Sequence, residues 1–579
     1  MAEQLLKGRF STEKSSFSFV SKQIMKRTWL AIGLILIFFL FLWPVIRLIA
    51  LSFSTDGGYA LSNYAAVLQE PKTWKILTNT AMIVLGSTII ALWLGVSFAW
   101  LIAYSDVRAK KWLHVMIMLP FIVPSYIVTL SWTRFFSKNG MAAHLLDFLP
   151  GNLEPLNLYS HTGIILILGL SHYPLVFLLT TSILRRIPRE LEWAVRSSGG
   201  SRWTAFQKVT LPLALPGIAG GGLLAFLANL DNFGIPAFLG IPANITVLST
   251  AIYQEIAGYG PTAFARAATF SVLLGAVALM GTLLQWFLLK RSKENENSDI
   301  DVKPRFSLGR YRTAVEAVLW GFLFFIGVVP IISMLASSLI RAYGLPFSLE
   351  NLTWDHYRFV LLEDEKVQGA IFNSLKLAIG TGMICLVAGT AIAYYRVRKN
   401  TAAGRFMELA VGLPYALPGM VLALAMILTW MEPVPGWNPG IYGSIWILFM
   451  AYVTRFLILQ VRGSMTAMSQ IAPSMEEAAH SSGAGTIVKW RKIMLPLLLP
   501  GLLSGALLVV LTTLTELTVS ALLWSSGSET IGLTIFNFEQ AGYTTYSTAF
   551  SGIIIMTMLI LAVIFLGFQK IYERKAGQK

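Results

Sequence analysis

Two stretches of the chain, 284 positions apart, decide the fold. Residues 191–221 read LEWAVRSSGGSRWTAFQKVTLPLALPGIAGG, and residues 475–505 read MEEAAHSSGAGTIVKWRKIMLPLLLPGLLSG. They align without a gap and share an acid, a small-residue turn and two prolines: Glu192, Ala194, Ser197, Ser198, Gly199, Lys208, Leu211, Pro212, Leu213, Leu215, Pro216, Gly217 and Gly221 all recur. Such a repeat indicates that the chain contains two copies of one structural unit.

A second pair of stretches aligns at an offset of 294. The matches are Asn79, Gly86, Gly95, Ala99 and Leu119-Pro120…Pro124 with Asn373, Gly380, Gly389, Ala393 and Leu413-Pro414…Pro418. The difference between the two offsets fits a loop near 431–440 that is shorter than its counterpart at 134–160. The duplication therefore extends over most of each half.

The composition excludes a soluble protein. Of 579 residues, 55% are hydrophobic and 13% are charged, about half the charge content of a typical soluble domain. The single cysteine, Cys385, excludes an internal disulfide, a cysteine-based zinc site or an iron–sulfur cluster. In so apolar a chain, the net charge of +16 indicates basic loops that face an anionic membrane leaflet, rather than a nucleic-acid partner.

Membrane-spanning helices need about 20 apolar residues. The sequence predicts about twelve, and therefore an all-α integral membrane fold: 28–52, 78–104, 112–133, 161–182, 212–239, 266–289, 315–340, 371–395, 406–430, 440–461, 496–524 and 549–570. Six spans in each half give two repeats with the same orientation, which is typical of transporters. We predict a tail at 1–27, a first module at 28–290, a hydrophilic linker at 291–312 and a second module at 313–579.

Basic residues set the expected orientation. Lys and Arg are concentrated in the tail, in the linker and in alternate loops, which all fall on one side of a twelve-span protein. Because positive loops stay in the cytoplasm, we expect both termini to be cytoplasmic and the duplicated loop to lie on the same side.

Each copy of the duplicated loop predicts a short helix, a turn and a second helix. Leu191, Ala194 and Val195, and likewise Met475, Ala478 and Ala479, recur at i, i+3 and i+4, the spacing of an amphipathic helix. Acids in the first turn suit the helix dipole; they are Glu192, Glu476 and Glu477.

A glycine and two prolines end each copy of the loop. Gly199 and Gly483 permit the sharp reversal that ends a helix. Leu-Pro then begins the next helix, where a proline is tolerated because first-turn amides have no intrahelical partner; the prolines are Pro212, Pro216, Pro496 and Pro500. Such a loop, rigidly joined to the following span, can transmit force from a cytoplasmic partner.

The loop resembles the EAA loop of ATP-binding-cassette importer permeases. The second copy, Glu477-Ala478-Ala479…Gly483, matches the pattern closely, whereas the first has Trp193 and Val195 in place of Glu477 and Ala479. The resemblance implies the type I importer permease fold and loops that dock on two ATPase subunits. The missing acid implies some asymmetry between the two docks.

A fused pair of modules resembles most the ferric-iron permeases of bacterial inner membranes. The stretches that support this are Asp231-Asn232-Phe233-Gly234-Ile235-Pro236-Ala237-Phe238-Leu239-Gly240 and Glu516-Leu517-Thr518-Val519-Ser520-Ala521-Leu522-Leu523. Similar permeases carry thiamine, polyamines or phosphonates, and these substrates stay open. The resemblance also implies a separate extracytoplasmic substrate-binding protein.

The sequence predicts a transport subunit rather than an enzyme. It has no GxxxxGK[ST] phosphate loop, so we expect partner subunits to bind and hydrolyse ATP, and no cofactor on this chain. A gradient-driven secondary transporter remains the main alternative, because it also uses twelve spans in parallel halves.

Two acids follow the repeated prolines by about 19–20 residues. At 1.5 Å per residue, Asp231 and Glu516 come near the outer side of the membrane. Acids there either line a translocation path or gate, or make hydrogen bonds at helix ends. No histidine pair has the spacing of a metal site, so no resident metal is expected.

Overall fold

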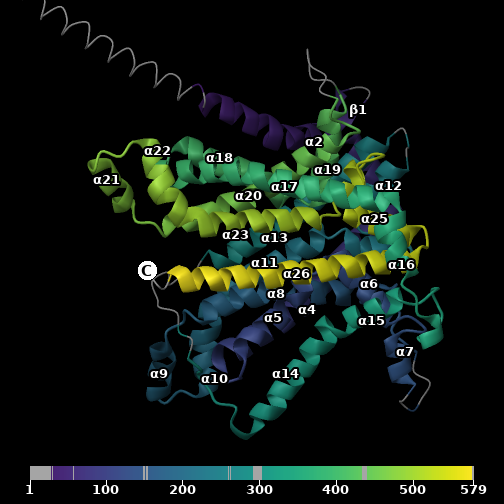
Figure 1. The fold of residues 1–579 in the computed structure, drawn as a ribbon, viewed down its shortest axis with the longest axis horizontal. Coiled ribbons are helices and arrows are strands. Elements are labelled where there is room, and N and C mark those ends of the chain that lie inside the picture. Colours follow the sequence, from purple (N-terminus) through teal and green to yellow (C-terminus); the bar gives the residue numbers. More distant parts are fainter. Residues whose placement is uncertain are drawn as a thin grey trace, which may run out of the picture. The chain divides into compact units, whose positions relative to one another are not determined.

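The computed structural model describes residues 28, 30–55, 58–147, 150, 154–258, 260, 262–290, 301, 303–432 and 440–576, with the side chains of 288, 480 and 561–576 excepted. The predicted tail at 1–27, and linker residues 291–300 and 302, lie outside the described residues. The described chain is almost entirely helical, as predicted, and its one named pair of strands is a two-residue hairpin (Figure 1).

The helices and strands follow one another along the chain. In order they are α2 Trp43–Phe53, β1 Ser54–Thr55, β2 Gly58–Tyr59, α3 Ser62–Gln69, α4 Pro71–Tyr104, α5 Lys110–Ile122, α6 Ser125–Phe135, α7 Met141–Leu146, α8 His161–Leu184, α9 Arg189–Ser197, α10 Arg202–Ala205, α11 Leu211–Asp231, α12 Leu248–Ala257, α13 Ala263–Leu289, α14 Arg312–Gly327, α15 Val329–Ser338, α16 Asp355–Arg358, α17 Glu365–Tyr394, α18 Ala402–Ala416, α19 Gly419–Trp430, α20 Ile445–Ser469, α21 Pro473–Ser481, α22 Thr486–Lys489, α23 Leu495–Leu514, α24 Ser520–Leu523, α25 Ile531–Gln540 and α26 Thr544–Ala576.

Short π-helical and 3₁₀ segments join or extend several of these helices. The π-helical segments are η1 Phe38–Leu42, η2 Phe206–Thr210, η3 Pro236–Gly240, η6 Phe359–Glu363, η7 Tyr395–Lys399 and η8 Trp490–Met494. The 3₁₀ segments are η4 Gly309–Tyr311 and η5 Leu349–Asn351.

Nine helical runs in the described residues are long and apolar enough to span a membrane, or up to eleven with two bent pairs. The nine are Leu30–Phe53, Pro71–Tyr104, His161–Leu184, Arg202–Asp231, Ala263–Phe287, Gly309–Ser338, Glu365–Lys399, Ile445–Ser469 and Thr486–Leu514. The chain is therefore a multi-pass membrane protein.

The spans expected at 112–133 and 406–430 each contain a sharp bend that the sequence analysis did not predict. α5 and α6 meet at 97°, and α18 and α19 meet at 109°. The breaks fall at Val123 and Leu417, each of which is extended and precedes a proline, Pro124 or Pro418. A proline ring clashes with a helical residue before it, so each helix ends there.

The chain forms two compact units that do not coincide with its sequence halves. One unit comprises Met1–Ala50, Leu375–Leu417 and Ala425–Leu514. The other comprises Leu51–Ser374, Pro418–Leu424 and Thr515–Lys579. The boundary expected at 291–312 stays a prediction, because a repeat is defined by sequence whereas these units are defined by contact.

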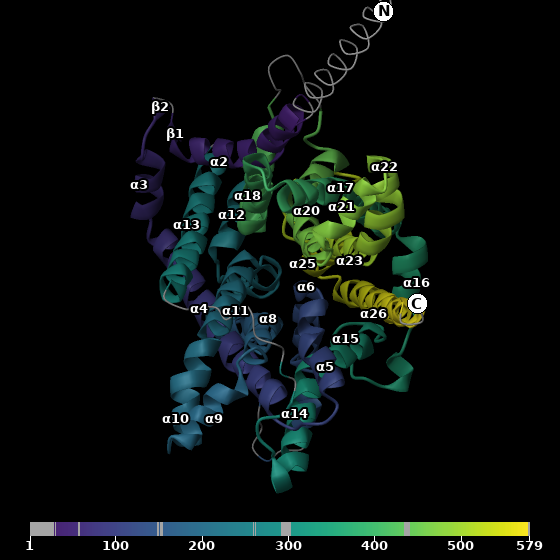
Figure 2. The same cartoon turned by 90° about the vertical axis from the view of Figure 1, so that its left-hand side faces the viewer.

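An exchange of first helices explains this difference. η1, which leads into α2, packs against α18 and α20 of the second half. Conversely, α14 and α15 begin the second half and pack against α5 and α6 of the first (Figure 2). Each compact unit therefore contains helices from both halves.

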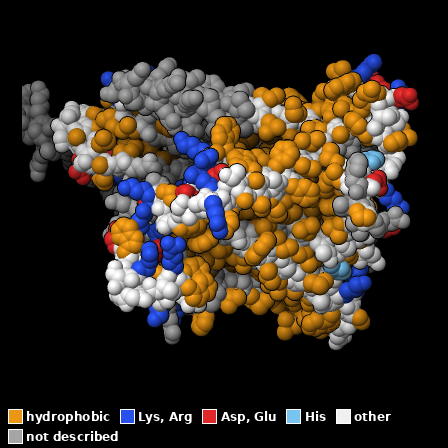
Figure 3. All heavy atoms as spheres, turned by 90° about the horizontal axis from the view of Figure 1, so that it is seen from below, with side chains coloured by type: hydrophobic (Ala, Val, Ile, Leu, Met, Phe, Trp, Pro, Cys, Tyr) orange, Lys and Arg blue, Asp and Glu red, His pale blue; other side chains and the backbone are white. Residues whose placement is uncertain are grey.

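The surface of the second unit fits a membrane environment. Figure 3 shows hydrophobic side chains spread over much of the face that carries α14, with several Lys and Arg near its left-hand end, where α9 and α10 lie in Figure 1. Trp286, Phe287 and Val318 are among the exposed large apolar side chains. In water such a surface would be unfavourable, whereas lipid tails solvate it.

Candidate functional site

The first duplicated loop folds as two short helices joined by a turn. α9 and α10 lie side by side at one end of α8 and α11 (Figures 1 and 2). Ser201 caps α10, since its hydroxyl accepts the Thr204 amide at 3.1 Å. A serine at this position satisfies an amide that the helix itself leaves unpaired.

The second duplicated loop has the same local form. α21 and α22 are joined by a turn and pack at one end of α20 and α23 (Figure 1). The repeat in sequence is therefore a repeat in structure.

A glycine in the left-handed region makes both turns. Gly199 has φ of +84° and Gly483 has φ of +75°, and a Cβ on either would meet no atom within 4 Å. The next residue's amide bonds back across the turn, Gly200 to the Val195 carbonyl at 2.9 Å and Ala484 to the Ala479 carbonyl at 3.0 Å. This six-residue closure is the Schellman motif, which needs a residue free to adopt positive φ.

Each loop continues without interruption into a membrane helix. Pro212 and Pro496 lie in the first turn of α11 and α23, where the structure places them directly after the π-helical segments η2 and η8. A π-turn shifts the hydrogen-bond register, so the helix passes the proline without ending. The helical runs therefore begin earlier than expected, at Arg202 and Thr486, and Pro216 and Pro500 lie inside them.

Glu192 faces the body of its own unit. It forms an ion pair with Arg305, and the Thr210 hydroxyl donates to its Oε1 at 2.7 Å. Thr210 lies at the start of the long helix that follows the loop, so this carboxylate ties α9 to that helix.

Glu476 occupies the aligned position in the second loop and also faces inward. Its Oε1 lies 2.6 Å from Arg398 Nε, and its Oε2 accepts from Lys489 Nζ at 2.7 Å. Ion pairs that are partly withdrawn from water are screened less by salt than surface pairs. The aligned glutamates Glu192 and Glu476 thus fix their loops to the chain rather than facing a partner.

The outward side of each loop carries exposed residues. In the first loop Ala194 is exposed; in the second, Glu477 and Ala478 are exposed, whereas Ala479 is buried. Large apolar side chains are also exposed at the tips: Leu191, Trp193 and Trp203 in the first loop, and Met475, Ile487 and Val488 in the second. Trp193 is 55% exposed and Ile487 is 82% exposed, so these surfaces suit docking by a protein partner.

The two loops differ in what lies beneath them. A pocket of about 730 Å³ opens under the first loop, and its lining includes Trp100, Tyr104, Glu192, Arg202 and Arg305. Under the second loop the side chains pack into a continuous apolar cluster: Ala393, Met468, Ile471, Met494, Leu498 and Leu502.

Asp231 is the last residue of α11. Its carboxylate accepts a hydrogen bond from the Gly419 amide, the first residue of α19. A carboxylate at a helix start satisfies a free amide and suits the helix dipole. Asp231 therefore stabilises the restart of the broken span.

Glu516 has a similar local role. It follows the end of α23 and is 8% exposed, and its carboxylate accepts the Val519 amide at 2.7 Å and the Ser520 amide at 3.1 Å. Ser520 begins the short helix α24. Both acids thus have helix-end hydrogen bonds, and a role in a translocation path or gate stays a prediction.

Nothing in the described part of the chain groups three or more His, Cys, Asp or Glu side chains as a metal site would. His172 is buried, and its Nδ1 lies 2.7 Å from the Asn229 side-chain oxygen. Cys385 is a buried free thiol. Both side chains are therefore enclosed by other parts of the fold.

The sequence reasoning missed the two arginines that hold the loops. From the sequence, Arg305 in the linker and Arg398 in a basic loop count only among the positive charges on the expected cytoplasmic side. The signal that points to Arg398 is its place near the end of a span that leads into a cytoplasmic loop. Arg305 has no comparable signal, because it lies 113 positions from Glu192.

Both sequence repeats match a known protein family. Residues 91–289 and 383–578 each match the family described as the binding-protein-dependent transport system inner membrane component. The matches cover more than half of the chain and both duplicated loops. The chain belongs to this family of transporter permeases, and it contains two copies of the family's unit with the type I importer permease fold.

Individual relatives fall into fused and single-unit permeases. The chain is 23% identical over 565 residues to the ferric transport system permease protein FbpB of Actinobacillus pleuropneumoniae, covering 96% of this chain and 80% of that one. It is 24% identical over 527 residues to the Fe(3+)-transport system permease protein FbpB 2 of Haemophilus influenzae, covering 89% and 93%. It is 29% identical over 259 residues to the spermidine/putrescine permease PotC of the same organism, covering 44% and 94%.

Proposed function

We propose that this chain is the membrane permease of an ATP-driven importer that takes up ferric iron. Two ATPase subunits would dock on the loops around α9 and α21, and a separate extracytoplasmic protein would deliver the substrate. The chain would lie in a bacterial inner membrane with both termini in the cytoplasm, consistent with the basic residues near its loops.

The observation that carries this proposal is the duplicated loop. Each copy presents exposed apolar residues outward, such as Trp193 and Ile487, and anchors the glutamate at the aligned position inward. A loop that only rested on the membrane surface would not need an anchored acid at the same position in both copies. A loop that receives force needs firm attachment to the helix it moves.

The helices that follow the loops provide the mechanical connection. Arg202–Asp231 is one run of 30 residues, about 45 Å long at 1.5 Å per residue. Its far end is Asp231, which holds the start of α19 through the Gly419 amide. Movement of α10 would therefore reach the break between α18 and α19.

Alternating access follows from this connection. Closure of the two ATPase subunits on ATP would draw the loops together and open the helices outward under the binding protein. Hydrolysis would release the loops and restore the inward-facing state. Broken helices such as α5–α6 and α18–α19 are typical of the regions where transporters bind or gate their substrates.

The ferric substrate rests on the fused relatives, and polyamine import is the second candidate. PotC, a spermidine/putrescine permease, is similar over less than half of this chain. The ferric permeases are similar over most of it. Thiamine and phosphonate have no relative among these three.

Uptake into proteoliposomes tests the proposal. The chain is reconstituted with its co-purified ATPase and binding protein, and uptake of ⁵⁵Fe³⁺ and of labelled spermidine is measured with and without enclosed ATP. We expect iron uptake that requires ATP and the binding protein. Spermidine uptake alone would replace the substrate, and uptake driven by an ion gradient without ATP would contradict the importer proposal and favour a secondary transporter.

A further inference from the structure

The two loops use different arginines for the same two contacts. In the second loop Arg398, from η7 just after α17, pairs with Glu476 and donates to the Ile471 carbonyl at 2.8 Å. In the first loop Arg305 pairs with Glu192 and donates to the Ile187 carbonyl. Each arginine therefore joins the aligned glutamate of its loop to the carbonyl five positions earlier.

These acceptors are related by the repeat. Glu192 and Glu476 are 284 positions apart, and so are Ile187 and Ile471. The two arginines are not related in this way: Arg398 lies within the second sequence repeat, whereas Arg305 lies in the linker between the two repeats. At the offset of 294 that aligns the second spans, the position of Arg398 corresponds to Tyr104.

Tyr104 supports Arg305, which has in the first loop the role that Arg398 has in the second. The Arg305 guanidinium lies 4.1 Å from the centre of the Tyr104 ring, a cation–π distance. The Tyr104 carbonyl also accepts the Arg305 amide at 2.7 Å. The side chains of Arg305 and Arg398 are similarly withdrawn from water, 7% and 11% exposed.

The segment that carries Arg305 is fastened on both sides of it. Before it, Asp301 pairs with Arg189 of α9, and the Asp301 amide donates to the Arg185 carbonyl at 2.7 Å. The Arg189 hydrogen bond lowers the pKa of Asp301, and the Leu308 amide likewise lowers the pKa of Asp106. Both carboxylates therefore remain charged at neutral pH.

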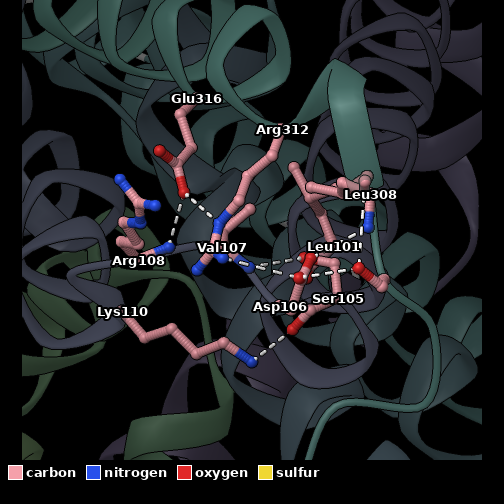
Figure 4. Close-up of polar contacts among 11 residues, drawn as sticks. Leu101, Ser105, Asp106, Val107, Arg108, Lys110, Leu308, Arg312 and Glu316 are labelled. Carbon is pink, nitrogen blue, oxygen red and sulfur yellow. Dashed lines mark hydrogen bonds and ion pairs between the residues drawn. The ribbon is translucent and has the colours of Figure 1, made fainter.

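The fastening continues after Arg305, at the loop between α4 and α5. Asp106 accepts the Leu308 amide at 2.9 Å and lies 3.6 Å from Arg312, and Glu316 accepts the Arg108 amide at 2.7 Å (Figure 4). The described part of the segment is thus an ordered strap across one end of its unit, joined to α9 and to the end of α4.

We propose that residues 301 and 303–308 form a clamp in which Arg305 positions the first loop, and that this loop alone depends on the linker between the two sequence repeats for its anchoring arginine. This inference rests on the proposed function only for its effect on transport. The second loop obtains the same anchor from its own sequence repeat. Arg305 is a positioning residue, since it acts through α9.

A spin-label experiment tests the clamp without any partner subunit. Ser197 and Ser481 are exposed, aligned positions on α9 and α21, so each is replaced by a labelled cysteine in a Cys385→Ala background. We expect Arg305→Ala to increase label mobility at 197 and leave 481 unchanged, and Arg398→Ala to do the reverse. Unchanged mobility at 197 in Arg305→Ala would overturn the clamp.

Moving the arginine sharpens the test. The double variant Arg305→Ala, Tyr104→Arg copies the arrangement of the second sequence repeat, and we expect it to restore the low mobility at 197. Arg310→Ala is the matched control, because it removes an exposed linker charge that contacts its neighbour Tyr311. Failure of the double variant to restore order, in a protein with unchanged melting temperature, would contradict the equivalence with Arg398.

A transport assay then measures how the clamp affects the coupling of ATP hydrolysis to transport. In the reconstituted importer we expect Arg305→Ala to lower substrate transported per ATP about tenfold, within the usual range of couplings between distant sites. The double variant with Tyr104→Arg should recover most of it. Normal transport with a mobile α9 would overturn the role in coupling, whereas absence of transport in the unaltered chain would instead contradict the proposed function.

Discussion

The loops around α9 and α21 reach the same fold with different supports. Both close on a left-handed glycine and anchor a glutamate to an arginine. The first takes its arginine from the linker between the two sequence repeats and lies over a pocket of about 730 Å³. The second takes its arginine from its own repeat and lies over packed side chains. What the architecture requires is a positive group at one point in space, from whichever segment can place it there.

Removing the anchored acids should have the largest effect on the comparison. Glu192→Ala leaves Arg305 without its carboxylate, and Glu476→Ala does the same to Arg398 and Lys489. Breaking a buried ion pair costs about 3–5 kcal/mol, and we expect the lower part of that range here because water reaches both sites. Glu476→Ala should lower the melting temperature more than Glu192→Ala, because it removes the carboxylate partner of two cations rather than one. A decrease in melting temperature equal to or smaller than that of Glu192→Ala would contradict this.

Changing an exposed residue and the turn of the second loop should have a large effect on the coupling of ATP hydrolysis to transport and a small effect on stability. Glu477→Ala with Gly483→Ala removes an outward charge and strains the turn, so we expect ATP hydrolysis to continue with little transport. Full uptake by this variant would count against docking at α21.

Trp193→Glu is the matched change in the first loop. It gives α9 the acid that α21 carries, and the side chain is exposed, so the fold should tolerate it. We expect ATPase binding to the two loops to become more alike, measured as a smaller difference between two dissociation steps in single-molecule binding. A larger difference would show that Trp193 itself is part of the dock.

Alanine at the turn glycines should have an equal and moderate effect in both loops. Gly199 and Gly483 have similar positive φ, and no neighbouring atom would meet a new Cβ. The cost is then the backbone strain of a non-glycine residue there, about 1 kcal/mol. Hydrogen exchange of α9 and α21 should rise by the same factor, and a difference of tenfold between them would indicate an unequal turn.

Acidification should have the smallest effect. The pKa values of Asp301 and Asp106 lie below the ordinary aspartate value of 3.8, so their stabilisation of the clamp is present above 3.8 and is lost only as the pH falls through the lower folded values. Between pH 8 and pH 5, hydrogen-exchange protection of 303–316, corrected for the intrinsic rate, should stay constant. A loss of protection within that range would contradict the ion-pair account of the clamp.

The sequence predicted the membrane class, the repeat and the glycine turns, because each depends on local chemistry or on self-similarity. The bends at Val123 and Leu417 also had a local signal, since the prolines that follow were already noted as repeated. Hydropathy alone could not detect them, because apolar residues continue across both breaks.

The pairing of Glu192 with Arg305 could not be predicted in the same way. The two residues are 113 positions apart, and no periodicity links a helix to a linker. The exchange of first helices, by which α14 and α15 pack on α5 and α6, was hidden for the same reason. Such contacts depend on tertiary folding rather than on any local pattern.

The most direct test of the account is the composition of the native complex. The tagged chain is purified from its own membranes in mild detergent, and the co-purifying subunits are identified and counted. We predict two ATPase subunits for each chain, one for each loop, and loss of one of them from a chain in which α9 is disordered by Arg305→Ala. A chain that purifies without any ATPase and transports substrate in liposomes on an ion gradient would contradict the account.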